Sequence, residues 1–135
     1  MPPLKYPARF EYLDEIREYV GQKARAAGFT DKEIYAIQLA VDEAASNVIE
    51  HAYAGVPNAS FELNCEFKKD RFVITLLDHG KSFDFSKVAK PRVRANLSER
   101  KIGGLGIYLM RKLMDEVHYE VTADGNLLTL IKRRD

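Results

Sequence analysis

The spacing of apolar residues predicts helices in the first part of the chain. Over residues 10–24 and 31–53, apolar side chains recur every three or four positions, which is typical of helices with one buried face. Thr30 and Glu33 have the spacing of a capping box, in which each side chain satisfies a backbone N–H at the start of the second helix. A third helix is expected after residue 103, where three glycines give way to an apolar run.

Shorter apolar runs predict a sheet. Residues 4–8 should form an edge strand, because nearby prolines cannot donate to neighbours on both sides. The other expected strands are 60–68, 71–77, 117–121 and 127–132, with turns at Lys69-Asp70 and Gly125-Asn126. These elements predict an α+β fold, a two-layer sandwich whose mixed and mostly antiparallel sheet has its helices on one face.

Composition limits the classes of protein to consider. The chain has 135 residues, of which 46% are hydrophobic and 30% charged, so we expect one globular domain over residues 1–135. A net charge of +1 argues against a general nucleic-acid binder. No long apolar run or signal peptide is apparent, and the single cysteine, Cys65, cannot form an internal disulfide. We therefore expect a cytoplasmic protein that binds neither nucleic acid nor membrane.

Glu43 and Asn47 are the first candidates for chemistry. They lie four residues apart in the second helix and so share one face, roughly opposite the apolar stripe and beside Ala36, Ala40 and Ala44. A carboxylate can take a proton from an attacking hydroxyl, and a carboxamide oxygen is a suitable Mg²⁺ ligand. Such a face can also simply be exposed to solvent, and the helix alone does not decide between the two interpretations.

Asp78 and Gly80 follow the predicted strand 71–77. A carboxylate only accepts hydrogen bonds, which suits the exocyclic amine of adenine and would repel the carbonyl of guanine. We expect this carboxylate at the rim of the sheet, and Gly80 would let the backbone pass close beneath a planar base. The alternative is an ordinary Asp-His-Gly turn.

Gly103-Gly104-Leu105-Gly106 opens the third helix, and the free N–H groups of a helix N-terminus can bind phosphate. The same glycines could also serve a flexible loop or close helix packing. The long segment before them, which we interpret as a lid, has seven basic and two acidic residues between Lys81 and Lys101, with Arg100 and Lys101 best placed for phosphate. His51, four residues after Asn47, either reaches a phosphate or lies on the surface near the helix end.

Taken together, Glu43 with Asn47, Asp78-x-Gly80 and Gly103-Gly104-x-Gly106 resemble the N, G1 and G2 boxes of the GHKL (Bergerat-fold) ATPases. The resemblance covers most of the chain. The segments from Asp78 to Asp84 and from Gly103 to Met110 look most like the stand-alone bacterial anti-sigma-factor serine/threonine kinases.

This resemblance implies that the cofactors are ATP and Mg²⁺, that Glu43 is the catalytic base, that Asn47 binds the metal and that Asp78 recognises adenine. Gly80, Phe83 and the glycines with Leu105 would surround the nucleotide. The implied partners are a sigma factor and an anti-anti-sigma protein of the STAS type, which such a kinase phosphorylates on serine. Kinases of this kind are commonly homodimers.

Two other functions are compatible with the same boxes: a nucleotide-gated binding module without kinase activity, and a switch kinase of a larger partner-switching assembly. The chain also departs from the family. Ser82 replaces the second glycine of the G1 box, and Asn126-Leu127 stands where a Gly-Thr pair often precedes the final strand. Arg100 matches a lid arginine only approximately, because its spacing to the glycines differs.

Overall fold

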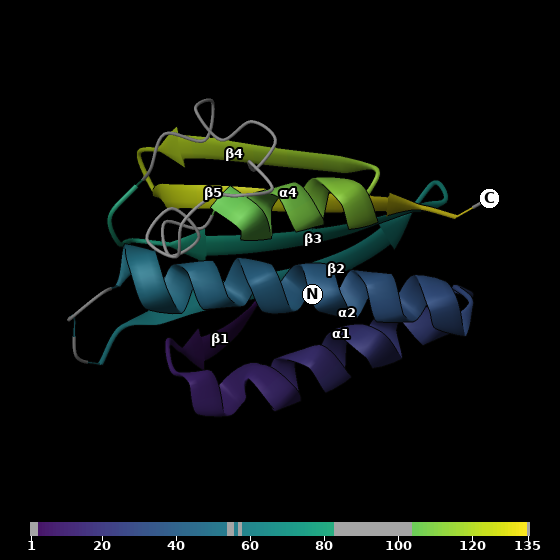
Figure 1. The fold of residues 1–135 in the computed structure, drawn as a ribbon, viewed down its shortest axis with the longest axis horizontal. Coiled ribbons are helices and arrows are strands. Elements are labelled where there is room, and N and C mark those ends of the chain that lie inside the picture. The colour runs from purple at the N-terminus through teal and green to yellow at the C-terminus, as the bar shows by residue number, and fades with distance from the viewer. Residues whose placement is uncertain (1–2, 54–55, 57, 83–103, 135) are drawn as a thin grey trace.

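Helices cover one face of a twisted sheet in the computed structural model, which describes residues 3–53, 56, 58–82 and 104–134 (Figure 1). The α2 helix crosses the middle of the sheet, α1 lies beside it on the side of β1, and α4 lies on its other side, near β5. The expected α+β class, with two layers and its helices on one face, is confirmed.

The sheet has the strand order β1-β2-β3-β5-β4, and each of its four described pairings is antiparallel. The sheet is thus antiparallel as expected for most of its pairs, and the expected mixture with parallel pairs is not found among the described strands. The N-terminal strand lies at an edge, as its prolines predicted. The strands are β1 (Leu4–Pro7), β2 (Ser60–Lys68), β3 (Arg71–Asp78), β4 (Glu116–Thr122) and β5 (Gly125–Arg133).

One turn was misplaced in the sequence analysis. Gly125 and Asn126 are the first two residues of β5, paired with Thr122 and Val121 of β4, so the turn lies at residues 123 and 124 instead. This shift of two residues matters, because it places the side chain of Asn126 in the sheet opposite Asp78.

The helices begin and end near the predicted positions. The Thr30–Glu33 capping box is present in both directions, and Gly28 ends the α1 region with a φ of 93°, which favours glycine. The α2 helix continues into a turn of π-helix, a feature often found at functional sites. The elements are η1 (Phe10–Tyr12), α1 (Leu13–Ala26), α2 (Asp31–Asn47), η2 (Val48–Ala52) and α4 (Gly104–Leu113).

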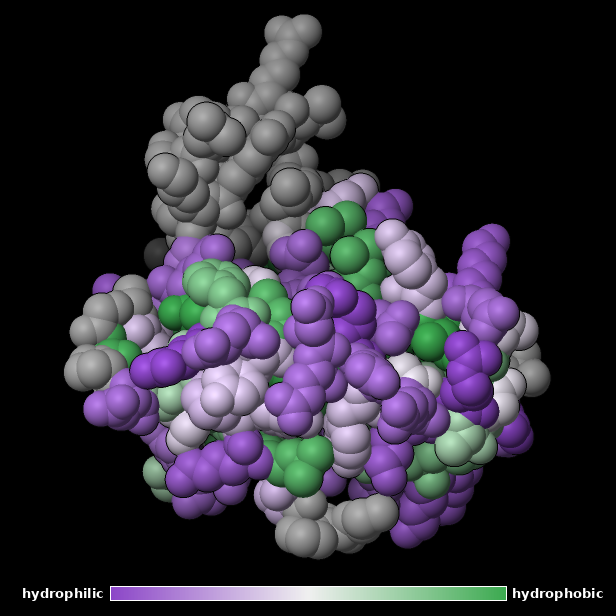
Figure 2. All heavy atoms as spheres, turned by 90° about the horizontal axis from the view of Figure 1, so that it is seen from below, coloured by the Kyte–Doolittle hydropathy of each residue, from purple (hydrophilic) through white to green (hydrophobic). Residues whose placement is uncertain are grey.

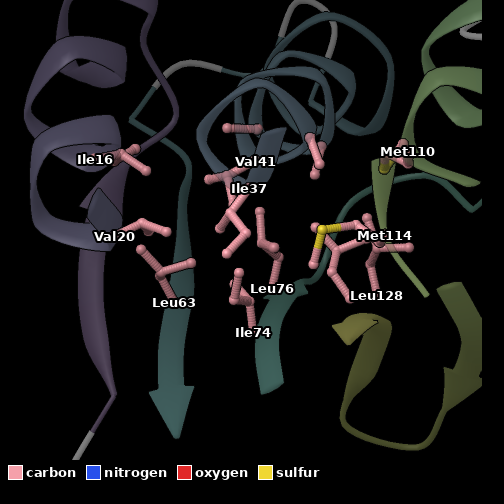
Figure 3. Packing of buried hydrophobic residues seen from close by; sticks show 14 of the residues in the cluster. Ile16, Val20, Ile37, Val41, Leu63, Ile74, Leu76, Met110, Met114 and Leu128 are labelled. Atoms are coloured by element: carbon pink, nitrogen blue, oxygen red, sulfur yellow. The ribbon is translucent and has the colours of Figure 1, made fainter. Parts of the chain in front are cut away.

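The core forms where the three helices meet the sheet. Its centre joins α1 and α2 to β2 and β3, and a second part joins α4 to β5 (Figure 3). Packing of this kind holds α2 between two helices and the sheet, so its position is fixed on three sides. The side chains labelled there are Ile16, Val20, Ile37, Val41, Leu63, Ile74, Leu76, Met110, Met114 and Leu128.

On the face seen in Figure 2, polar side chains cover most of the described surface, and apolar ones form small separate groups. None of the helices in the described part of the chain is long and apolar enough to cross a membrane.

Candidate functional site

The face of α2 that carries Glu43 and Asn47 is largely covered, with Asn47 buried and Glu43 partly so. Asn47 is 9% exposed, and Ala40 and Ala44 on the same side of α2 are fully buried. The reason is α4, which packs on α2 with Gly106 against this side. Of the two interpretations of this helix face, a solvated surface is therefore wrong.

Gly106 is the residue of α4 that comes nearest to the pair. A Cβ placed on it would lie 2.9 Å from Oε2 of Glu43 and 3.5 Å from Nδ2 of Asn47. Any larger residue at position 106 would force either the helix or the carboxylate to move. The first turn of α4 thus brings its backbone directly against the acid and the amide.

Glu43 is half-buried, and within the described residues it accepts no hydrogen bond. Burial is the main cause that raises the pKa of Glu43, followed by the negative charges of Asp42 and Glu50 on the same helix. A raised pKa makes the carboxylate a stronger proton acceptor than an ordinary surface glutamate once it is ionised. Both its position and its electrostatics suit a general base.

Asn47 has an incompletely satisfied carboxamide. Its Nδ2 is buried and has no hydrogen-bond partner within the described residues. Such an atom carries a desolvation cost that a bound ligand could remove, and a half-turn of the amide exchanges the positions of oxygen and nitrogen. A neutral oxygen ligand at this point fits Mg²⁺, which prefers oxygen and is held by few protein groups when phosphates supply the rest. The described residues contain no cluster of three or more His, Cys, Asp or Glu that could hold a metal without such help.

Asp78 ends β3 as predicted, but its carboxylate is buried, with 5% exposed, and not at an open rim. Its Oδ1 accepts hydrogen bonds from the backbone N–H of Gly80, at 2.9 Å, and from Nδ2 of Asn126, at 2.8 Å. The carboxylate was expected at the rim of the sheet, and it does lie at the end of β3, but neighbouring elements pack over this end and bury it. The helix end around Tyr53 and the start of β5 cover this point.

Gly80 is required here by the protein itself. A Cβ at this position would overlap the carbonyl of Ala52 and would lie 2.9 Å from Cδ1 of Tyr53. The next residue, Lys81, donates its backbone N–H to the carbonyl oxygen of Ala52, at 2.8 Å, and His79 donates its own to the hydroxyl of Tyr53, at 2.7 Å. The chain after β3 is therefore fastened to the end of the π-helical turn.

Asn126 is a site residue that the sequence analysis did not assign. It is 3% exposed and uses Nδ2 to donate both to Oδ1 of Asp78 and to the carbonyl oxygen of Gly80, the latter at 2.9 Å. Its role follows from the pairing of β3 with β5, in which Asp78 lies opposite Asn126. The only sequence signal was the departure from Gly-Thr at this place.

A small cavity lies between Asn47 of α2 and Asp78 of β3. It is lined by residues that include Ala44, Asn47, Asp78, Lys81 and Leu128, and its volume of about 20 Å³ is enough for roughly one water molecule. Asn47 and Asp78 thus face the same space from opposite elements. A purine base needs far more room, so nucleotide binding requires the cavity to widen.

The remaining predicted residues contribute less to this picture. Phe83, Arg100, Lys101 and Gly103 lie outside the described residues, as does most of the predicted lid. Gly104 and Leu105 form the start of α4 with Gly106. His51 lies in the π-helical turn, with its Nε2 3.7 Å from Oε2 of Glu50. It does not line the cavity.

Comparison with known families decides what kind of domain holds this site. A family model described as the histidine kinase-like ATPase domain matches residues 6–132. The chain belongs to this family. The matched range includes Glu43, Asn47, Asp78 and Gly106, so all three sequence motifs lie within this ATPase domain.

Among curated relatives of this ATPase domain, the serine-protein kinase RsbW of Bacillus pumilus is 36% identical over 126 residues, covering 89% of this chain and 78% of the relative. The serine-protein kinase RsbW of Staphylococcus aureus (strain MSSA476) is 34% identical over 123 residues, covering 84% of this chain and 75% of the relative. Both similarities extend over most of either protein.

Solved structures support the fold. The RsbU and RsbW domains of Rv1364c from Mycobacterium tuberculosis match with a TM-score of 0.67 and 20% identity over 98% of this chain, which spans 32% of that solved chain. The histidine kinase AdeS of Acinetobacter baumannii matches with a TM-score of 0.56 and 10% identity, covering 98% of this chain and 68% of that one. At these identities the likeness concerns the fold alone.

Proposed function

We propose that this protein is an ATP-dependent serine/threonine protein kinase that acts as an anti-sigma factor, binding a sigma factor and phosphorylating a STAS-type anti-anti-sigma protein. Membership of the ATPase family and the similarity to serine-protein kinases named RsbW support this function. The observation that carries it is the meeting of Glu43 and Asn47 with the first turn of α4, beside a cavity that Asn47 lines from the helix side and Asp78 from the sheet side.

In this proposal Glu43 is the general base. It takes the proton of the partner's serine hydroxyl as that oxygen bonds to the γ-phosphorus, the bond to the bridging oxygen breaks, and ADP leaves. Asn47 holds Mg²⁺, which when bound offsets the negative charge of the phosphate groups. Asp78 accepts a hydrogen bond from adenine. Most of the rate enhancement would come from positioning, because phosphoryl transfer needs little covalent help from the protein.

The other predicted residues keep their roles as proposals. Gly80 and Phe83 would border the base, and the segment Gly103-Gly104-Leu105-Gly106 would present backbone N–H groups to the phosphates. Arg100, Lys101 and His51 would add positive charge or hydrogen-bond donors there. We further propose that the whole chain is one such domain and that it acts in the cytoplasm as a homodimer.

A phosphotransfer assay tests the function. Purified protein is incubated with radiolabelled ATP and STAS proteins, and the product is examined for phosphoserine; sigma factors are tested for binding in parallel. Glu43→Gln should retain ATP binding and lose transfer. Glu18→Gln, which removes an exposed carboxylate of α1 that is not among the charges acting on Glu43, serves as the control and should transfer normally.

The outcome also separates the alternative functions. Transfer that persists in Glu43→Gln would contradict the assigned base. ATP and sigma-factor binding without any phosphoserine would instead indicate a nucleotide-gated binding module. Phosphorylation of a larger regulatory assembly, without sigma-factor binding, would indicate a switch kinase.

A further inference from the structure

The segment that ends β3 is hydrogen-bonded to its neighbours at every residue from Asp78 to Lys81. From Asp78 to Lys81, each residue makes a hydrogen bond to another element or within the turn: His79 to Tyr53, Gly80 to Asp78, and Lys81 to the carbonyl of Ala52. These bonds fix the segment on its helix side. On its sheet side the corresponding contacts come from the start of β5.

Two residues make that sheet-side contact. Gly125 has a φ of 135° and lies so close that a Cβ would overlap the carbonyl oxygen of Asp78. This close approach brings Asn126 within reach of both Oδ1 of Asp78 and the carbonyl oxygen of Gly80, at 2.8 and 2.9 Å. Because both partners are acceptors, the orientation of the Asn126 amide is unambiguous, with the nitrogen toward Asp78.

The two oxygens of the Asp78 carboxylate differ in their hydrogen bonding. Oδ1 takes the N–H of Gly80 and the amide of Asn126, whereas within the described residues no hydrogen bond falls on Oδ2. A carboxylate fixed through one oxygen cannot rotate without losing both of its donors. Its second oxygen is then held in one direction, as an acceptor for a donor that arrives from the cavity.

We infer that Asn126 is a positioning residue for base selection, which aligns the Asp78 carboxylate so that Oδ2 receives an exocyclic amine and rejects a carbonyl. This inference rests on the proposed function, since it assumes that a purine nucleotide occupies the cavity. Asn126 itself touches neither the base nor the phosphates in this scheme. It acts through Asp78 and through the carbonyl of Gly80, to which its amide also donates.

The test compares ATP with inosine triphosphate, in which a carbonyl replaces the amine. Calorimetric titration of both nucleotides, with Mg²⁺, is carried out on the full chain and on Asn126→Leu, which has similar size but no donor. Loss of the fixed acceptor should weaken ATP binding by about tenfold or more and change inosine triphosphate binding much less, since a buried group left without its partner costs roughly that amount. Thr129→Val, on the same strand but the opposite face, should leave both affinities unchanged.

Each result has a clear meaning. If the ratio of the ATP affinity to the inosine triphosphate affinity is the same in Asn126→Leu as in the unmodified protein, the inference is overturned. The same holds if both affinities fall equally and the variant also has a lower melting temperature, because the loss then reflects general destabilisation. If the unmodified protein binds neither nucleotide, the proposed function fails, and this inference fails with it. If it binds ATP and only the ratio is insensitive to Asn126, the inference alone fails.

A second variant and a measurement without substitution guard against misfolding. Asn126→Ala is smaller and should show the same loss of discrimination. In the unmodified protein, the side-chain NH₂ signals of Asn126 in a nitrogen-15 spectrum should be protected from exchange and should move when ATP is added, with a smaller change on adding inosine triphosphate. Signals that exchange freely, or that respond equally to both nucleotides, would contradict the inference.

Discussion

Glu43 and Gly106 lie in contact across the α2–α4 interface: a Cβ on Gly106 would be 2.9 Å from Oε2 of the glutamate. This contact predicts that Gly106→Ala separates activity from stability. The added methyl group must displace the carboxylate or the start of α4, and small misplacements of a catalytic group can cost on the order of a hundredfold in rate. Alanine also favours helix by up to about 1 kcal/mol over glycine, so the fold should not suffer.

The measurement is serine phosphotransfer alongside thermal unfolding. Gly21→Ala is the matched control, because the new Cβ there meets the flexible end of Gln38, away from the site. We expect Gly106→Ala to lose at least about tenfold in transfer rate at near-normal stability, and Gly21→Ala to keep its rate. Full activity in Gly106→Ala would mean that α4 does not stay against Glu43 during the reaction.

Glu43→Gln should stabilise the protein at neutral pH. Burial, with the charges of Asp42 and Glu50, raises the pKa of Glu43, so the folded state binds this proton more tightly than the unfolded chain does. The stability that the protonated form contributes is fully present at pH values below the pKa of Glu43 in the unfolded chain. It is lost as pH rises through the pKa of Glu43 in the folded protein. Glutamine mimics the protonated form and escapes this loss.

Chemical denaturation of both proteins over a range of pH tests this. The advantage of Glu43→Gln should be largest near neutral pH and should disappear on acidification through the pKa of Glu43, and it should stay below about 1 kcal/mol because the side chain is only half-buried. An equal or lower stability at neutral pH would show that the ionised carboxylate is satisfied by its surroundings.

Asp42 should influence the pH dependence of transfer. Its charge is the second cause of the raised pKa of Glu43, after burial, and its Oδ2 also accepts a 2.9 Å hydrogen bond from Nε of Arg17. A base must be ionised to work, so transfer should decline as pH falls through the pKa of Glu43. Asp42→Asn lowers that pKa and should move the decline to lower pH.

The pH–rate profile of Asp42→Asn is compared with that of Asp14→Asn. Asp14 contacts the same arginine, at 2.9 Å from Nη1, but is not among the charges that act on Glu43. Its profile should match the unmodified protein. A decline that moves equally in both variants would assign the effect to Arg17, and one that moves in neither would remove Asp42 from the electrostatics of the base.

Features set by neighbouring residues could be predicted from the sequence. The capping box of Thr30 and Glu33 depends on four consecutive residues, and it forms as expected. The turn at Lys69-Asp70 depends on two residues that adopt φ values of 55° and 61°, and it too lies where the polar break between apolar runs indicated. The spacing of Glu43 and Asn47 likewise needs only the period of a helix.

Features that depend on which elements meet could not be predicted in this way. Nothing in the spacing of α2 indicates that α4 will cover Ala40 and Ala44, because that depends on how the third helix returns across the sheet. The contact of Asn126 with Asp78 joins residues that are 48 positions apart in sequence and depends on the register between β3 and β5. A shift of two residues in the predicted turn was enough to hide it.

Thr30→Ala should lower the free energy of unfolding by about 1 kcal/mol, the usual cost of losing an N-cap side chain. The Thr30 hydroxyl accepts the backbone N–H of Glu33 at 3.2 Å, and Glu33 Oε1 accepts that of Thr30 at 2.9 Å. Denaturant unfolding measures the loss, and Thr30→Ser, which keeps the oxygen, should recover most of it. No difference between the two variants would mean that the cap contributes nothing beyond the backbone conformation.

The same cap should weaken in acid. Its hydrogen bonds with Thr30 hold the pKa of Glu33 below its usual value, so the stability that it contributes is present above the unfolded pKa and is lost as pH falls through the folded pKa. Glu33→Gln should therefore reduce the acid sensitivity of unfolding over that interval. An unchanged pH dependence would contradict the assigned cause.

Cys65 should react slowly with thiol reagents in the folded protein. Burial raises its pKa to about 12 from an ordinary value of 9.0, and the opposing charge of Lys23 only partly offsets this. The thiolate is the reactive form, so at mildly alkaline pH the rate of alkylation should be roughly a thousandfold below that of the unfolded chain. Because the chain has one cysteine, mass spectrometry of the labelled protein with and without denaturant gives this ratio directly. Labelling at the rate of a free thiol would show that the edge of the sheet around β2 opens readily, and would make Cys65 a usable probe of that opening.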